Sequence, residues 1–102
     1  MLFDGLESKL REAKLHFESG NIAGRGAAIS KAIDIVNLGL LAGLDMQKGG
    51  EIAHNLKEVY MIVAQELMEA NAESDPEKLS RAMAQIARIS SAWREMEREN
   101  GH

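Results

Sequence analysis

The sequence predicts an all-α protein, an antiparallel up-down-up-down four-helix bundle with a shortened first helix. Apolar residues recur at every third or fourth position through most of the chain, which is the period of a helix. No segment keeps the strict apolar and polar alternation that is typical of a half-buried strand. The single proline, Pro76, follows Asp75 at an expected helix start, where its missing N–H group costs nothing.

Four helices are expected at about residues 2–19, 22–43, 50–72 and 76–98. Gly20 and Asn21 are suited to ending one helix and capping the next. Connections this short make successive helices antiparallel neighbours. The expected core stripes are, in chain order, Phe3, Leu6, Leu10, Ala13 and Phe17; Ile22, Ile29, Ile33, Val36 and Leu40; Ile52, Leu56, Val59, Val63 and Leu67; and Leu79, Ala82 or Met83, Ile86, Ile89, Trp93 and Met96.

Length and composition restrict the function classes. A chain of 102 residues is expected to form a single domain over residues 1–102. The net charge of −4 and the scarcity of aromatic residues argue against a nucleic-acid partner, which requires a clustered basic face. No apolar run is long enough for membrane insertion, and no signal peptide is recognisable. The absence of cysteine excludes a thiol nucleophile, and we expect a cytoplasmic protein of the cytosol.

The stretch DMQKGGEIAHNL, residues 45–56, carries more polar chemistry than most helix starts. A phosphate-binding loop needs its lysine after the glycines, followed by serine or threonine. Here Lys48 precedes Gly49 and Gly50, and Glu51 follows them with a negative charge. A flexible joint between two helices is therefore the better interpretation.

The same stretch contains a Glu-x-x-His pair, Glu51 and His54, of the kind that diiron bundles use twice. Neither His16 nor His102 has a glutamate three residues before it, so the second pair is missing. Glu51 and His54 also lie off the apolar stripe that begins at Ile52, and should face solvent. We expect no metal, no cofactor and no enzymatic activity.

The most informative feature is a surplus of apolar surface. Residues 59–64, VYMIVA, are apolar or aromatic all around the expected third helix, whereas a bundle helix needs a stripe only about 100° wide. The expected second helix carries an additional apolar face. Contiguous exposed apolar surface usually marks a partner site, and the predicted partner-binding residues of this belt are Ile35, Leu38, Leu41, Tyr60, Met61, Ile62 and Met68.

Several segments resemble the flagellin-specific export chaperones of the FliS family. They are MLFDG at the start, LDMQKGGEIAHNL in the centre, and then VY, ELMEAN and the spaced DPEKL and SSAW. The resemblance covers essentially all of the chain, and its centre, residues 44–56, is the most specific part. In that family the central stretch is the joint between two helices, in agreement with the interpretation above.

The resemblance implies a cytosolic chaperone that binds the disordered C-terminal region of flagellin through apolar grooves. Such a chaperone prevents premature polymerisation and delivers flagellin to the flagellar type III export apparatus, possibly with contact to the export gate. Family members carry a tyrosine-containing segment ahead of MLFDG that folds over the bundle, and this sequence lacks it. We therefore expect bare apolar surface at the start of the first helix, around Leu2, Phe3 and Leu6.

A second hypothesis is that the exposed apolar surface mediates self-association. The exposed belt could meet its own copy and form a homodimer, which would make the protein a self-associating helical scaffold without export cargo. A shortened first helix favours this alternative, because a second chain can cover a face that the first helix leaves open.

Overall fold

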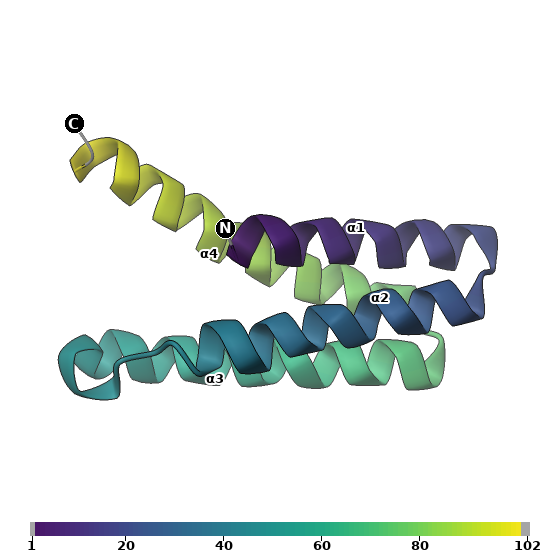
Figure 1. Ribbon diagram of the computed structural model, residues 1–102, viewed down its shortest axis with the longest axis horizontal. Coiled ribbons are helices and arrows are strands. Elements are labelled where there is room, and N and C mark those ends of the chain that lie inside the picture. Colours follow the sequence, from purple (N-terminus) through teal and green to yellow (C-terminus); the bar gives the residue numbers. More distant parts are fainter. Residues whose placement is uncertain (1, 101–102) are drawn as a thin grey trace.

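The structure, a computed structural model, describes residues 2–100 apart from the side chains of residues 97 and 100. The described part is helical and has no strand. The elements in chain order are α1 (Leu2–Ser19), α2 (Ile22–Asp34), the π-helix η1 (Ile35–Leu41), α3 (Met46–Glu73) and α4 (Pro76–Asn100). Successive helices run antiparallel and form a bundle (Figure 1), which confirms the predicted fold class.

Helix α1 is the short member of the bundle, as predicted. It has 18 residues, against 20 in α2 and η1 together (13 and 7), 28 in α3 and 25 in α4. Its first two turns lie beside the last third of α4, where the Arg94 guanidinium bonds to the carboxylates of Asp4 at 3.1 Å and Glu7 at 2.9 Å. Beyond this point α4 continues without α1 and diverges from α3 (Figure 1).

Two of the predicted joints are confirmed in detail. Gly20 has a φ of 72°, the left-handed conformation that ends many helices. The Asn21 side chain then accepts a hydrogen bond from the Gly24 backbone N–H at 3.0 Å. At the last joint, the Asp75 carboxylate accepts a hydrogen bond from the Glu77 N–H at 3.0 Å, so Pro76 is the first residue of α4.

The start of α3 differs from the prediction. The Asp45 carboxylate accepts hydrogen bonds from the backbone N–H groups of Gln47 and Lys48 at 3.1 and 2.9 Å. The helix therefore begins at Met46, four residues before the expected position. Gly50 interrupts it with φ 53° and ψ −128°, a conformation essentially restricted to glycine. The joint proposed from the sequence is thus a capped turn followed by a glycine kink.

The expected second helix is also modified, since its last part is the π-helix η1. A π-helix is wider than an α-helix and rare except as a single turn. Here the widened turn brings Gly39 against the Leu2 side chain, where a Cβ atom on Gly39 would lie only 3.0 Å from a Leu2 methyl carbon. The start of α1 therefore packs on η1 through a position that has no side chain.

The core lies between all four helices and consists of alanine and aliphatic residues with one tyrosine. Its largest fully buried hydrophobic side chains are Leu6, Leu10, Ile29, Leu67, Leu79, Ile86, Val36 and Val63. Most of the predicted stripes are confirmed as core or as its half-buried margin.

Four predicted core positions are wrong: Ile22, Ile52, Trp93 and Met96 are all exposed. Ile22 is the first residue of α2, ahead of the part that packs. The other three lie where α3 begins and α4 ends, in the part of the bundle where these two helices diverge (Figure 1). A stripe identifies the face of a helix that could be buried, but a neighbour must be present to bury it.

None of the helices in the described range 2–100 is sufficiently long and apolar to cross a membrane.

Candidate partner-binding surfaces

Five of the predicted partner-binding residues are exposed in the structure. Leu38 is 76% exposed, and Met61, Ile62 and Met68 are each 51–58% exposed along α3. Leu2, at the start of α1, is 50% exposed although one side of it contacts Gly39. Large apolar side chains at these exposures are unusual when they are contiguous.

Two of the predicted residues are buried, so their expected exposure is wrong. Tyr60 is 2% exposed and Leu6 is 0% exposed, and both belong to the core. Leu6 is covered because the first turns of α1 already pack on the bundle. Tyr60 lies one residue before Met61 and therefore about 100° away on the helix, which turns it inward. Burial raises the pKa of the Tyr60 phenol above its ordinary value.

The remaining predicted residues have side chains of intermediate solvent exposure; they are Phe3, Ile35 and Leu41. All three are half-buried and pack against the margin of the core. Only part of each side chain is therefore available to a partner.

The exposed residues of α3 border a groove between η1 and α3. Two hollows of ≈ 330 and ≈ 550 Å³ share Asn37 and Met61, so they form one continuous depression. We call it the Met61 furrow, and it is lined chiefly by Asn37, Leu41, Leu44, Met46, Met61, Ala64 and Met68. From Lys57 to Met68 it follows α3 for ~17 Å, which is about three helical turns.

Polar groups mark the ends and one lip of the furrow. Gln65 donates a hydrogen bond to the Glu69 carboxylate at 3.0 Å, and the Lys78 ammonium lies 2.7 Å from the same carboxylate. The Lys78 and Gln65 hydrogen bonds lower the pKa of Glu69, so this group stays ionised and paired. The furrow is thus a mainly apolar channel in which Glu69 is paired with Lys78, while Lys57 adds an exposed cation.

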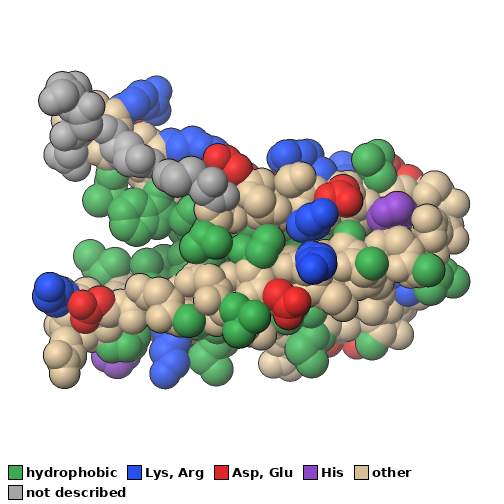
Figure 2. All heavy atoms as spheres, viewed as in Figure 1, with side chains coloured by type: hydrophobic (Ala, Val, Ile, Leu, Met, Phe, Trp, Pro, Cys, Tyr) green, Lys and Arg blue, Asp and Glu red, His purple; other side chains and the backbone are tan. Residues whose placement is uncertain are grey.

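A second apolar hollow was not identified from the sequence. It lies between the start of α3 and the end of α4, has a volume of ≈ 470 Å³, and we call it the outer cleft. Its walls are Ile52, Leu56, Arg88, Ile89, Ala92, Trp93 and Met96. Hydrophobic side chains line the gap between the two arms on the left of Figure 2.

The outer cleft lies where the end of α4 diverges from the start of α3 (Figure 1). Ile52 is 72% exposed, Met96 51% and Trp93 43%. No signal in the sequence shows that the two helices diverge here, and the stripes alone assigned these residues to the core.

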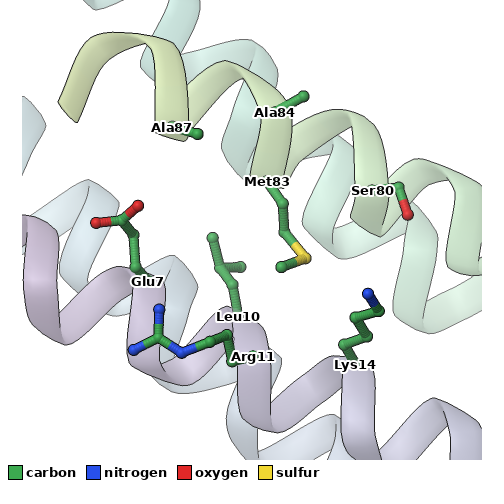
Figure 3. A pocket seen from close by; sticks show the side chains of 8 residues that line it. All are labelled: Glu7, Leu10, Arg11, Lys14, Ser80, Met83, Ala84 and Ala87. Atoms are coloured by element: carbon green, nitrogen blue, oxygen red, sulfur yellow. The ribbon is translucent and has the colours of Figure 1, made fainter. Parts of the chain in front are cut away.

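A third hollow, of ≈ 430 Å³, separates α1 from α4, and we call it the α1–α4 groove. Figure 3 shows its lining residues, which come from both helices: Glu7, Leu10, Arg11, Lys14, Ser80, Met83, Ala84 and Ala87. It differs from the other two in having cationic side chains on one wall and very small side chains on the other.

The residues considered for metal or phosphate chemistry are not assembled into a site. Glu51 and His54 are both exposed, in agreement with their predicted orientation. Within residues 2–100, no three histidine or carboxylate side chains lie close enough together to hold a metal ion. The arrangement that the structure does offer is apolar and suited to non-covalent recognition of a peptide.

Comparison with known proteins gives the family. The family model described as Flagellar protein FliS matches residues 1–100. The flagellar secretion chaperone FliS of Salmonella typhimurium strain LT2 is 43% identical over 96 residues, which are 94% of this chain and 71% of that protein. The protein of the same description from Escherichia coli K12 is 36% identical over 95 residues, 93% of this chain and 70% of that protein. The flagellar secretion chaperone FliSB of Pseudomonas aeruginosa PAO1 is 34% identical over 93 residues, 91% of this chain and 73% of that protein. The chain therefore belongs to the FliS family of flagellar proteins.

Proposed function

We propose that this chain is a cytosolic flagellar secretion chaperone that captures the disordered C-terminal segment of flagellin in the Met61 furrow. Bound flagellin is kept from polymerising prematurely and is delivered to the flagellar type III export apparatus, where the chaperone contacts the export gate. No chemical step is required. The observation that carries the proposal is the pair of exposed methionines, Met61 and Met68, that line the furrow between η1 and α3. Ile62 on α3 and Leu38 on η1 add further exposed apolar surface on the same two helices.

The physical chemistry of the furrow fits a disordered ligand. Fully burying one methionine or leucine side chain contributes ~1.5–3 kcal/mol, and a disordered segment must first offset the free-energy cost of becoming ordered. Several apolar contacts along the furrow are therefore needed for useful affinity. Methionine suits this role because its flexible thioether adapts to varied partners. The resulting complex can also dissociate, as export requires.

Titration calorimetry with a flagellin C-terminal peptide tests the proposal. We expect Met61→Asp and Met68→Asp to weaken binding by about tenfold or more, because each places a charge against the apolar ligand. Both positions are exposed, so melting temperatures should stay close to that of the parent protein. Leu15→Asp is the matched control, since Leu15 is 63% exposed on α1, away from the furrow. Equal affinity in all three variants and the parent would refute the Met61 furrow as the flagellin site.

The outer cleft favours a second candidate, self-association into a homodimer. Ile52, Trp93 and Met96 expose apolar surface that a second copy could cover. Light scattering across a concentration series distinguishes the two candidates. A tight dimer that Met96→Glu dissociates, and that does not bind flagellin peptide, would support the scaffold. A monomer that binds the peptide supports the chaperone.

A further inference from the structure

The α1–α4 groove has a chemistry that flagellin capture in the Met61 furrow does not use. It lies between α1 and α4, whereas the Met61 furrow lies between η1 and α3. None of its lining residues lines the furrow or the outer cleft. Its occupant can therefore be considered separately.

The apolar part of the groove is a floor that a helix could contact. Leu10 is 1% exposed, and Met83 is half-buried beside it. In Figure 3 the Met83 thioether extends from α4 into the space between Leu10 and Lys14. A flexible thioether on the floor can adjust to the side chains of a docked partner.

The wall on α4 explains why the groove is open. Ser80, Ala84 and Ala87 are spaced by four and three residues, so they lie on one face of α4 over ~10 Å. All three are exposed, and none has a side chain that reaches across to α1. Helices usually pack with their axes 8–10 Å apart, at a distance set by the side chains at the contact. A helix meeting this wall could approach at the short end of that range.

The wall on α1 supplies charge. Arg11 and Lys14 are exposed, and neither forms an ion pair with another residue of the described range. Figure 3 shows the Lys14 side chain extending towards Ser80 and that of Arg11 folding towards Glu7.

The one acid in the groove is already engaged. The Glu7 carboxylate lies 2.9 Å from the Arg94 guanidinium and accepts a hydrogen bond from the Ser90 hydroxyl at 3.2 Å. Ser90 is itself 1% exposed. The charge available to a ligand is therefore positive, although the whole chain has a net charge of −4.

We propose that the α1–α4 groove is a docking site for an acidic amphipathic helix of a protein partner other than flagellin. The apolar stripe of that helix packs on Met83, Ala84 and Ala87. Aspartate or glutamate beside the stripe pairs with Arg11 and Lys14. Two cations are too few for a nucleic acid or an anionic membrane, which both rely on many simultaneous charge contacts. The two grooves can be occupied together, so a loaded chaperone can hold a second protein.

The test uses two synthetic probes and the whole chain. The acidic probe is an amphipathic peptide of about 16 residues, enough to fold as a helix on binding, with leucine on its apolar stripe and glutamate beside it. The second probe has lysine in place of every glutamate. Methyl NMR of the methionines locates binding, because Met83 lines only this groove and Met96 only the outer cleft.

We expect the acidic probe to shift the Met83 signal and to bind at least about fivefold more tightly than the lysine probe at low salt. The double variant Arg11→Glu with Lys14→Glu should reverse this preference, and Ala84→Gln should block both probes by filling the wall. All three substituted residues are exposed, and unchanged melting temperatures establish that the variants are folded. Met61→Asp, in the furrow, should have no effect.

Three results would overturn the proposal. The first is an acidic probe that binds parent and double variant equally. The second is a probe that shifts Met61 or Met96 and leaves Met83 unchanged. The third is absence of binding by either probe at millimolar concentration. None of these results bears on flagellin capture, which depends on different residues.

Discussion

Arg25 of α2 contacts residues of both α1 and α3. It is 9% exposed, and its guanidinium donates to the Asn71 side chain at 3.1 Å and to the Asn71 carbonyl at 3.2 Å. It also lies 4.9 Å from the centre of the Phe17 ring, a cation–π distance. Asn71 is in the last turn of α3, where exposed carbonyls favour a cation. Arg25 thus fixes the position of α2 against both α1 and α3.

We predict that Arg25→Ala lowers the free energy of unfolding by about 2–4 kcal/mol, because two charge-assisted hydrogen bonds are lost and Asn71 is left without its partner. Chemical denaturation measures the change. Arg11→Ala is the control, since Arg11 is exposed and should cost less than about 0.5 kcal/mol. Similar losses in the two variants would show that the buried contacts of Arg25 contribute little.

Tyr60 gives the fold a dependence on alkaline pH. Burial raises the pKa of its phenol above the ordinary value of 10.0, so the unfolded chain loses this proton first as the pH rises. The contribution of the buried phenol to the free energy of unfolding is therefore fully present below pH 10. It decreases as the pH rises from there through the pKa of the folded state. We predict that the parent loses more stability than Tyr60→Phe between pH 9 and pH 11, measured by urea denaturation. Parallel losses would mean that the phenol is solvated in the folded protein.

At the scale of elements, the sequence predicted those helix ends that short-range chemistry determines. Asn21 and Asp75 each accept a backbone hydrogen bond close to their own position, and this pattern is visible in the residues themselves. The start of α3 was misplaced because Asp45 and the glycine pair gave two competing signals four residues apart. The π-helix was not predicted, since seven residues are too few to separate its period from that of an α-helix.

Alanine substitutions at Gly50 and Gly5 should change the stability of the protein in opposite directions. Gly50 has φ 53° with nothing near its absent Cβ, so Gly50→Ala should cost about 1–3 kcal/mol through backbone strain alone. Gly5 lies inside α1, and a Cβ there would meet Ile35 at an ordinary 3.9 Å. Gly5→Ala should therefore raise stability, by about 0.5–1 kcal/mol. Thermal unfolding measures both changes, and a stabilising Gly50→Ala would mean that the kink in α3 is absent.

At the scale of the whole molecule, the surplus of apolar surface could be predicted, but its distribution could not. Met61, Ile62 and Met68 were correctly expected to be exposed. For Met61 and Ile62 the reason is that the six apolar residues 59–64 surround one helix and cannot all face inward. The sequence could not show that Tyr60 is buried while its neighbours are exposed, because it does not reveal which face of α3 packs on the bundle. Trp93 and Met96 were misassigned because their burial depends on how closely α3 and α4 approach each other there, which is a property of the assembled bundle.

The three hollows have different chemistry and therefore different expected ligands. The Met61 furrow is long and apolar, the outer cleft is the most strongly apolar, and the α1–α4 groove has a cationic wall. Each contains methionine: Met46, Met61 and Met68 line the furrow, Met83 the α1–α4 groove and Met96 the outer cleft. One set of methyl signals can therefore report on all three surfaces in a single sample.

Methyl NMR of the intact chain during titration with a flagellin C-terminal peptide tests the central claim most directly. The account predicts that the signals of Met61 and Met68 move first and saturate together, with Met46 following where the ligand extends along the furrow, and that Met83 stays unchanged. A titration that moves only Met83 or Met96, or that leaves every methionine signal in place, would contradict capture of flagellin by the Met61 furrow.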